Sequence, residues 1–227
     1  MRKIVIVITM GILLVASVDA RRPKDRAGKV DDGVYVDKKY KFQLTLPDDW
    51  KSKVGDNEDK FRLTVSQTTF EIPPHYSDSK DYTKIPRTVV YVDTTSMNVT
   101  EFVDSLLSES YSSDQKKEVY KEFEILNKYS GGSGLTREDL VQRTRKPMDL
   151  AGERGFLWAG KVKYRNEISE TATDAGGKRV YGGYFGSIIA VKKGNMIILM
   201  HTICEENYSD NIMAEAMKMA NSLKWTE

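Results

Sequence analysis

The sequence predicts an α+β protein, in which a mostly antiparallel β-sheet has helices packed on its faces. Apolar and polar residues alternate over 40–46 and again over 61–65, as in half-buried strands. Gly194-Asn195 separates two apolar runs and predicts a two-residue hairpin, which joins antiparallel strands. An amphipathic segment beginning at Ser209 predicts a C-terminal helix. The order strands, helices, strands, helix suits helices layered on a sheet.

The first 20 residues have the organisation of a secretory signal peptide. Arg2 and Lys3 precede an uncharged run over 4–16, and Val18 and Ala20 satisfy the small-residue rule for cleavage. The run is shorter than the roughly 20 residues that span a bilayer. We expect cleavage after Ala20, no stable membrane span in the mature form, and a periplasmic or secreted, hence extracytoplasmic, location. A buried core segment and an uncleaved anchor are the alternatives.

Composition indicates a globular chain and excludes several classes of protein. With 227 residues, of which 40% are hydrophobic and 10% aromatic, the chain is neither collagen-like nor a multi-span membrane protein. A net charge of +2 provides no bulk electrostatic attraction for nucleic acid, so we expect no such partner. A disulfide needs two cysteines and the chain has only Cys204, so its stability must come from an apolar core.

The rest of the chain divides into a leader and one domain. Residues 21–33 are polar and charged and predict a flexible leader. Residues 34–227 show no repeat and no break in composition, which predicts a single domain. Within it, 71–86 is expected to be a surface loop and 88–92 a central strand.

Capping signals predict the helices. Asn98 and Glu101 have the spacing of a capping box, and the same spacing recurs at Ser112 and Gln115 before a second apolar stripe that ends at Leu126. For the last helix we expect a cap at Ser209 and a buried face of Ile212, Met213, Ala216, Met217, Ala220 and Leu223. One core is expected to hold Phe42, Leu44, Leu46, Trp158 and Leu223.

Aromatic side chains on adjacent predicted strands are the candidate binding residues. They could line a groove for a sugar or a peptide, or they could belong to the core: Trp158, Tyr164, Tyr181 and Tyr184. A set of basic residues near them predicts either a cationic patch or a solvated strand face: Lys161, Lys163, Arg165, Lys178 and Arg179.

The residue types needed for common chemistries are few. His75 and His201 are the only histidines, and His201 and Cys204 lie three apart on a predicted strand, where they point to opposite faces. We therefore expect no metal site, no cofactor and no histidine-dependent catalysis. Neither a complete phosphate-binding loop nor a calcium loop is present, and 56–60 is predicted to be a solvated charged loop. Paired-carboxylate hydrolysis stays open.

Two short blocks carry a family resemblance. The pattern Tyr40-x-Phe42-x-Leu44-x-Leu46-Pro47-x-x-Trp50 resembles the opening strand of PsbP-like proteins. The ending is also similar: a hairpin at 192–195, a strand, and a helix that ends near Leu223. The resemblance implies an α/β/α sandwich, shared with bacterial envelope proteins of mostly unknown function, and it implies binding rather than catalysis. It transfers no functional residue.

These observations together predict a function class. We expect a secreted or periplasmic, non-catalytic binding or scaffold domain for an unidentified protein or envelope partner. The alternatives are a carrier of a small ligand and a carboxylate-based hydrolase.

Overall fold

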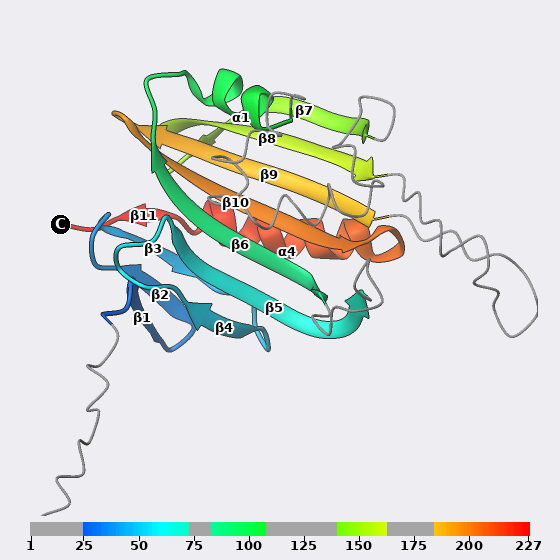
Figure 1. The fold of residues 1–227 in the computed structure, drawn as a ribbon, viewed down its shortest axis with the longest axis horizontal. Helices are drawn as coiled ribbons and strands as arrows, with labels where there is room; N and C mark the ends of the chain where they lie inside the picture. Colours follow the sequence, from blue (N-terminus) through cyan, green and yellow to red (C-terminus); the bar gives the residue numbers. More distant parts are fainter. Residues whose placement is uncertain (1–24, 73–82, 108–139, 163–183) are drawn as a thin grey trace, which may run out of the picture.

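A computed structural model describes residues 25–72, 83–107, 140–162 and 184–227, which form two antiparallel sheets with helices beside them (Figure 1). The larger sheet has seven strands in the order β4-β5-β6-β10-β9-β8-β7, and every neighbouring pair is antiparallel. The predicted mostly antiparallel sheet is therefore confirmed. The strands are β4 (Lys51–Val54), β5 (Phe61–Ile72), β6 (Thr83–Thr94), β7 (Leu140–Leu150), β8 (Glu153–Val162), β9 (Tyr184–Lys193) and β10 (Met196–Glu205).

The smaller sheet is built from both ends of the described chain. Its order is β1-β2-β3-β11, from β1 (Gly28–Asp31), β2 (Val34–Asp37), β3 (Phe42–Thr45) and β11 (Lys224–Trp225). The short strand β11 pairs Trp225 with Phe42, so the C-terminal strand is held against β3 of the β2–β3 pair.

Strand β1 corrects the predicted flexible leader over 21–33. Ala27 is fully buried, and a Cβ on Gly28 would lie 2.2 Å from the Val36 carbonyl oxygen, so this segment packs closely against β2. Asp32 and Gly33 turn the chain with φ values of 45° and 73°, as a tight hairpin requires. Residues 27–33 therefore belong to the fold. The sequence did not predict this, because the pairing is made by the backbone while the side chains are mostly polar. Residues 21–24 lie outside the described part.

Among the residues that the structure describes, two α-helices accompany the sheets, α1 (Val99–Leu107) and α4 (Ser209–Asn221). The capping box predicted for α1 is confirmed: the Glu101 amide donates to Asn98 Oδ1 at 2.9 Å, and the Asn98 amide donates to Glu101 Oε2 at 3.1 Å. The first turn of α4 differs from the prediction, because its cap is Tyr208, which makes no side-chain capping bond. The helix predicted over 112–126 lies outside the described residues.

The hairpin predicted at Gly194-Asn195 is confirmed by the pairing of Lys193 with Met196 across it. Gly194 has φ 58°, a value that suits the first position of such a turn. Two predicted boundaries were wrong: β5 runs to Ile72 and β6 begins at Thr83, so both ends of the expected loop over 71–86 belong to strands, and residues 73–82 lie outside the described part. The sequence did not predict β7, an edge strand whose polar residues and Pro147 obscure its alternation.

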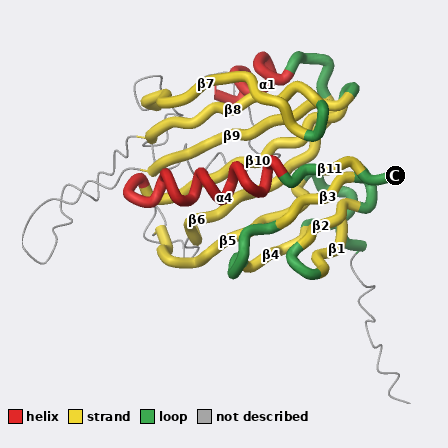
Figure 2. Tube along the Cα trace, turned by 180° about the vertical axis from the view of Figure 1, so that it is seen from behind, coloured by secondary structure: helices red, strands yellow, loops and turns green. Residues whose placement is uncertain are grey.

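The large sheet separates two apolar cores. Figure 2 shows α4 lying across one face of this sheet. The core on the α4 side, which we call the α4 face, holds Ile212, Ala216, Met219 and Ala220 of α4 together with residues of both sheets. The core on the opposite side, the α1 face, holds Phe102, Val103 and Leu106 of α1. In the predicted buried face of α4, Met213 and Met217 are only half-buried, and Met219 is buried instead.

Trp158 corrects the prediction of a single shared core. Phe42, Leu44, Leu46 and Leu223 pack together on the α4 face, as expected, whereas Trp158 belongs to the core on the α1 face. Successive side chains of a strand point to opposite faces, so a strand in the middle of a layered fold supplies both cores. Its neighbour Leu157 packs on the α4 face.

Candidate functional site

Polar residues gather on the α1 face where three neighbouring strands, β4, β5 and β6, lie side by side. Leu63 and Val65 of β5 pack on the α4 face, so Thr64 and Ser66 point to the α1 face. Residues directly opposite each other on paired strands share a face. Lys53 therefore joins Thr64 in one row.

A second row lies beside the first. Lys51 pairs with Ser66, and Ser66 pairs with Arg87. Lys51 and Lys53 are exposed, whereas Thr64, Ser66 and Arg87 are half-buried. We call these five residues the polar strip.

A β-bulge at the start of β5 sets this register. The pairing with β6 shifts between Phe61 and Leu63, so these two residues pack on opposite faces of the sheet. Phe61 meets Tyr91 edge to face on the α1 face, with ring centroids 6.2 Å apart. The bulge thereby brings Thr64 and Ser66 to the same face as this aromatic pair.

The two rows of the polar strip continue into an apolar region. Thr64 is followed across the sheet by Val89, His201, Ile188 and Trp158. His201 is fully buried, and burial, with a smaller contribution from the charge of Arg87, lowers its pKa to about 3. The imidazole is therefore neutral near pH 7 and is not poised to exchange protons there.

The predicted orientation of His201 and Cys204 is confirmed. Leu199 and Ile203, the neighbours of His201, belong to the core on the α1 face. Met200 and Cys204 belong to the core on the α4 face. The sheet thus separates the imidazole from the thiol. His75 lies outside the described residues.

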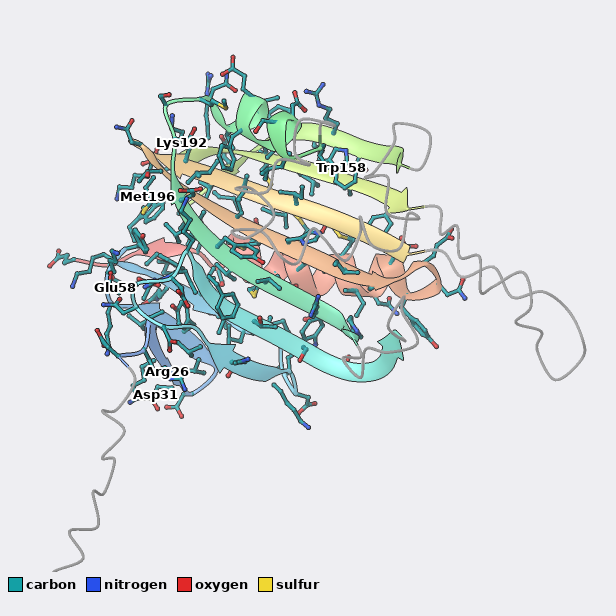
Figure 3. The ribbon with its side chains drawn as sticks, in the orientation of Figure 1. Arg26, Asp31, Glu58, Trp158, Lys192 and Met196 are labelled. Atoms are coloured by element: carbon teal, nitrogen blue, oxygen red, sulfur yellow. The ribbon has the colours of Figure 1, made fainter. Side chains whose placement is uncertain are left out.

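The four predicted aromatic site residues have different outcomes. Trp158 is 3% exposed and packs in the same core as α1 (Figure 3), which agrees with the core alternative for that residue. Tyr184 begins β9, where its backbone pairs with Val162 and Glu205. Tyr164 and Tyr181 lie outside the described residues. An aromatic groove formed by all four stays a prediction.

The predicted basic patch has a similar outcome. Lys161 is part of β8, where it pairs with Val141 and Phe185. The other members are outside the described ranges: Lys163, Arg165, Lys178 and Arg179. The polar strip was not predicted. It lies on β4, β5 and β6, at the opposite edge of the large sheet from β7 and β8. Its signal was the alternation of β5, in which Thr64 and Ser66 interrupt the apolar residues.

Sequence reasoning also missed a buried ion pair between the two sheets. Arg62 Nε donates to Asp37 Oδ2 at 2.7 Å, and both side chains are 0% exposed. The Tyr35 hydroxyl donates to the same carboxylate oxygen at 2.7 Å. Arg62 Nη1 donates to the carbonyl oxygens of Asn57 and Asp59, each at 2.8 Å. The loop over 56–60, predicted to be only a solvated charged loop, thus also accepts hydrogen bonds from a buried guanidinium.

This ion pair holds the fold together rather than forming a reactive centre. Asp37 Oδ1 also accepts from the amides of Lys39 and Tyr40, at 3.0 and 2.8 Å, so both of its oxygens are engaged. Burial, together with the neighbouring Asp37, raises the pKa of the Tyr35 hydroxyl, which stays protonated and donates. With both oxygens already occupied by donors of the fold, this carboxylate has no lone pair directed at a substrate.

Among the described residues, no three histidine, cysteine or acidic side chains lie close enough together to hold a metal ion. No helix within them is long and apolar enough to cross a membrane.

Comparison with known proteins gives similarity at the level of shape. No family model and no curated protein matches the chain. The solved structures include LpqN, involved in cell envelope biogenesis of Mycobacterium tuberculosis, at 11% identity and a TM-score of 0.45, covering 90% of this chain and 91% of that one. A Bacteroides thetaiotaomicron protein matches at 9% identity and a TM-score of 0.41, covering 86% of this chain and 48% of that one.

A PsbP structure is also among these matches. Cyanobacterial PsbP from Synechocystis sp. PCC 6803 is 12% identical with a TM-score of 0.47, and the match covers 87% of this chain and 96% of that chain. Values this low describe shape and say nothing about activity. The solved structures that resemble this chain thus include a PsbP protein, as the sequence pattern predicted, and a cell-envelope protein.

Proposed function

We propose that this protein is an exported, non-catalytic domain that binds a protein or an envelope component through the α1 face of its large sheet. The observation that carries the proposal is the polar strip. Lys51 and Lys53 are exposed beside the half-buried Thr64 and Ser66, at the edge of the sheet away from β8 and β9, the strands on which α1 mainly packs. Polar side chains that project from a rigid sheet are suited to binding, because the scaffold orders them before the partner arrives.

The non-catalytic part of the proposal is supported by the state of the reactive groups. His201 is buried and neutral, and Asp37 is engaged by Arg62. Both groups are buried, so neither has the access to a substrate that general acid–base catalysis needs. The involvement of LpqN in cell envelope biogenesis fits the same class of function.

Site-specific photo-crosslinking tests the binding surface. A photoreactive residue placed at Lys53, in the polar strip, is expected to capture a discrete partner in the native host. The same residue at Lys218, an exposed position of α4, is the matched control. Equal capture from both positions, or capture from Lys218 alone, would contradict the proposal.

Export is tested separately by intact-mass measurement of the native protein. Cleavage after Ala20 removes 20 of the 227 residues and leaves 207. A mature form that retains the uncharged run over 4–16 would refute export through a cleaved signal peptide.

A further inference from the structure

The small sheet has one face against the core and one face turned to solvent. Tyr35, Phe42 and Leu44 are fully buried in the core on the α4 face. Successive side chains of a strand point to opposite faces, so the residues between them point away from the core. Val36 is one of these, and it is 39% exposed, which is unusual for a large apolar side chain in this protein. We call this side of the small sheet the outer face.

The side chains of the outer face form two rows across the strands. Backbone pairing gives the first row the order Lys29, Val36, Gln43 and Lys224. The second row, two residues further along each strand, consists of Asp31, Val34 and Thr45. Residues directly opposite each other share a face, and rows two residues apart are separated by about 7 Å.

One acidic and one basic side chain lie together at the β1 edge of the outer face. Lys29 Nζ lies 2.7 Å from Asp31 Oδ2, and the two side chains are 73% and 71% exposed. An ion pair this exposed contributes little to the stability of a fold. Both groups can therefore exchange this contact for one with another molecule at little cost.

The two rows are complementary to each other in charge. A two-fold axis that runs across the strands, midway between the rows, lays the first row of one copy over the second row of another. Lys29 of each copy then faces Asp31 of the other, so both charge contacts are attractive. A two-fold axis along the strands would instead lay Lys29 over Lys224, and like charges would meet. The charges thus select the first arrangement.

The uncharged residues of the two rows match in the same arrangement. Val36 of each copy faces Val34 of the other, which buries apolar surface at the centre. Gln43 faces Thr45, and an amide and a hydroxyl can each donate and accept a hydrogen bond. Lys224 lies at the far rim, where solvent screens its charge.

From this complementarity we infer that the outer face of the small sheet binds a second copy of the protein, sheet on sheet, as a two-fold dimer. Sheets that pack face to face lie about 10 Å apart, which leaves room for the two rows of side chains to interdigitate. The face is small, so the dimer belongs with transient complexes that bury less than about 1,200 Å² in total. The inference goes beyond the proposed function, since the polar strip lies on the other sheet.

Sedimentation equilibrium of the mature chain at concentrations from about 10 µM to about 1 mM tests the dimer. We expect a dissociation constant on the order of 100 µM, as suits an interface of this size. Val36→Glu places a carboxylate at the apolar centre from each copy and is expected to weaken association at least about tenfold. Because Val36 points to solvent in the monomer, the urea unfolding midpoint of this variant should stay close to that of the native protein.

Charge exchange tests the predicted pairing directly. Lys29→Asp and Asp31→Lys each make both charge contacts repulsive, and each is expected to weaken association about tenfold although they shift the net charge in opposite directions. The two changes combined restore the attraction and should return the dissociation constant to within about threefold of the native value. Lys218→Asp is the matched control, because it disrupts an equally short exposed ion pair, with Glu215 at 2.7 Å on α4, and it should change the constant less than about twofold.

Four results would each overturn the inference. They are a monomer at every concentration, a loss in Lys218→Asp as large as that in Lys29→Asp, additive losses in the combined exchange, and a dimer that Val36→Glu leaves intact. The last result would place the contact on another surface of the protein. None of the four bears on crosslinking from Lys53, so the proposed function is tested independently of the dimer.

Discussion

Removing both partners of the Arg62–Asp37 ion pair is expected to destabilise the fold by less than the sum of the two single removals. The pair is fully buried, and it joins the small sheet, through Asp37 of β2, to β5 of the large sheet. Asp37→Leu leaves the guanidinium bonded to carbonyl oxygens but without a counter-charge, and it deprives the Tyr35 hydroxyl of its acceptor. Arg62→Met leaves a carboxylate that keeps three other donors.

The magnitudes follow from these remaining contacts. Breaking a buried ion pair from one side costs about 3–5 kcal/mol. We place Arg62→Met near 3 kcal/mol, because Asp37 remains hydrogen-bonded, and Asp37→Leu near 5 kcal/mol, because a buried cation and a buried hydroxyl both lose a partner. The double variant contains no uncompensated charge, so its cost should fall at least 2 kcal/mol below the sum of the two single costs.

Urea unfolding of the native protein and the three variants, followed by circular dichroism, measures these free energies. The difference between the double variant and the two single variants gives the coupling between Arg62 and Asp37. Additive costs within about 0.5 kcal/mol would refute the buried contact between the two side chains. A single-variant loss below about 1 kcal/mol would show that the guanidinium reaches solvent.

Three further predictions concern the cores, the pH dependence and a helix cap. Because burial holds the pKa of His201 near 3, the unfolded chain binds the extra proton between that value and its ordinary pKa near 6.5. Stability should therefore fall as the pH is lowered through this window, by up to about 1.4 kcal/mol per pH unit, and His201→Gln should flatten the curve; parallel curves would contradict this. Leu44→Ala, at a fully buried position, should cost about 2–5 kcal/mol in urea unfolding, and a loss below about 1 kcal/mol would mean that the register of β3 differs. Asn98→Ala should cost about 0.5–2 kcal/mol through the lost capping bond, whereas Asn98→Asp, which keeps an acceptor, should cost much less; equal losses would argue against the cap.

Local signals in the sequence were enough wherever one short segment determines its own structure. The alternation over 40–46 predicted β3, and the capping-box spacing of Asn98 and Glu101 predicted the start of α1. The Gly194-Asn195 turn predicted the hairpin of β9 and β10. These features depend on side-chain period, capping bonds and backbone turns, all of which act within a few residues.

Pairing between distant segments was beyond the sequence, because it depends on which surfaces meet in space. Strand β11, close to the C-terminus, pairs with β3, near the start of the described residues. Trp158 and Leu44 look alike as alternating apolar residues, yet the large sheet separates them into different cores.

The candidate site shows the same division between local and tertiary information. Composition and spacing correctly indicated that His201 and Cys204 would point apart, since the alternation of one strand decides it. The polar strip arises only when β4, β5 and β6 lie in register, and Arg62 meets Asp37 only when the small sheet packs on β5. A period within a strand determines which face a side chain points to, whereas its neighbours on that face are decided by the packing of strands far apart in the chain.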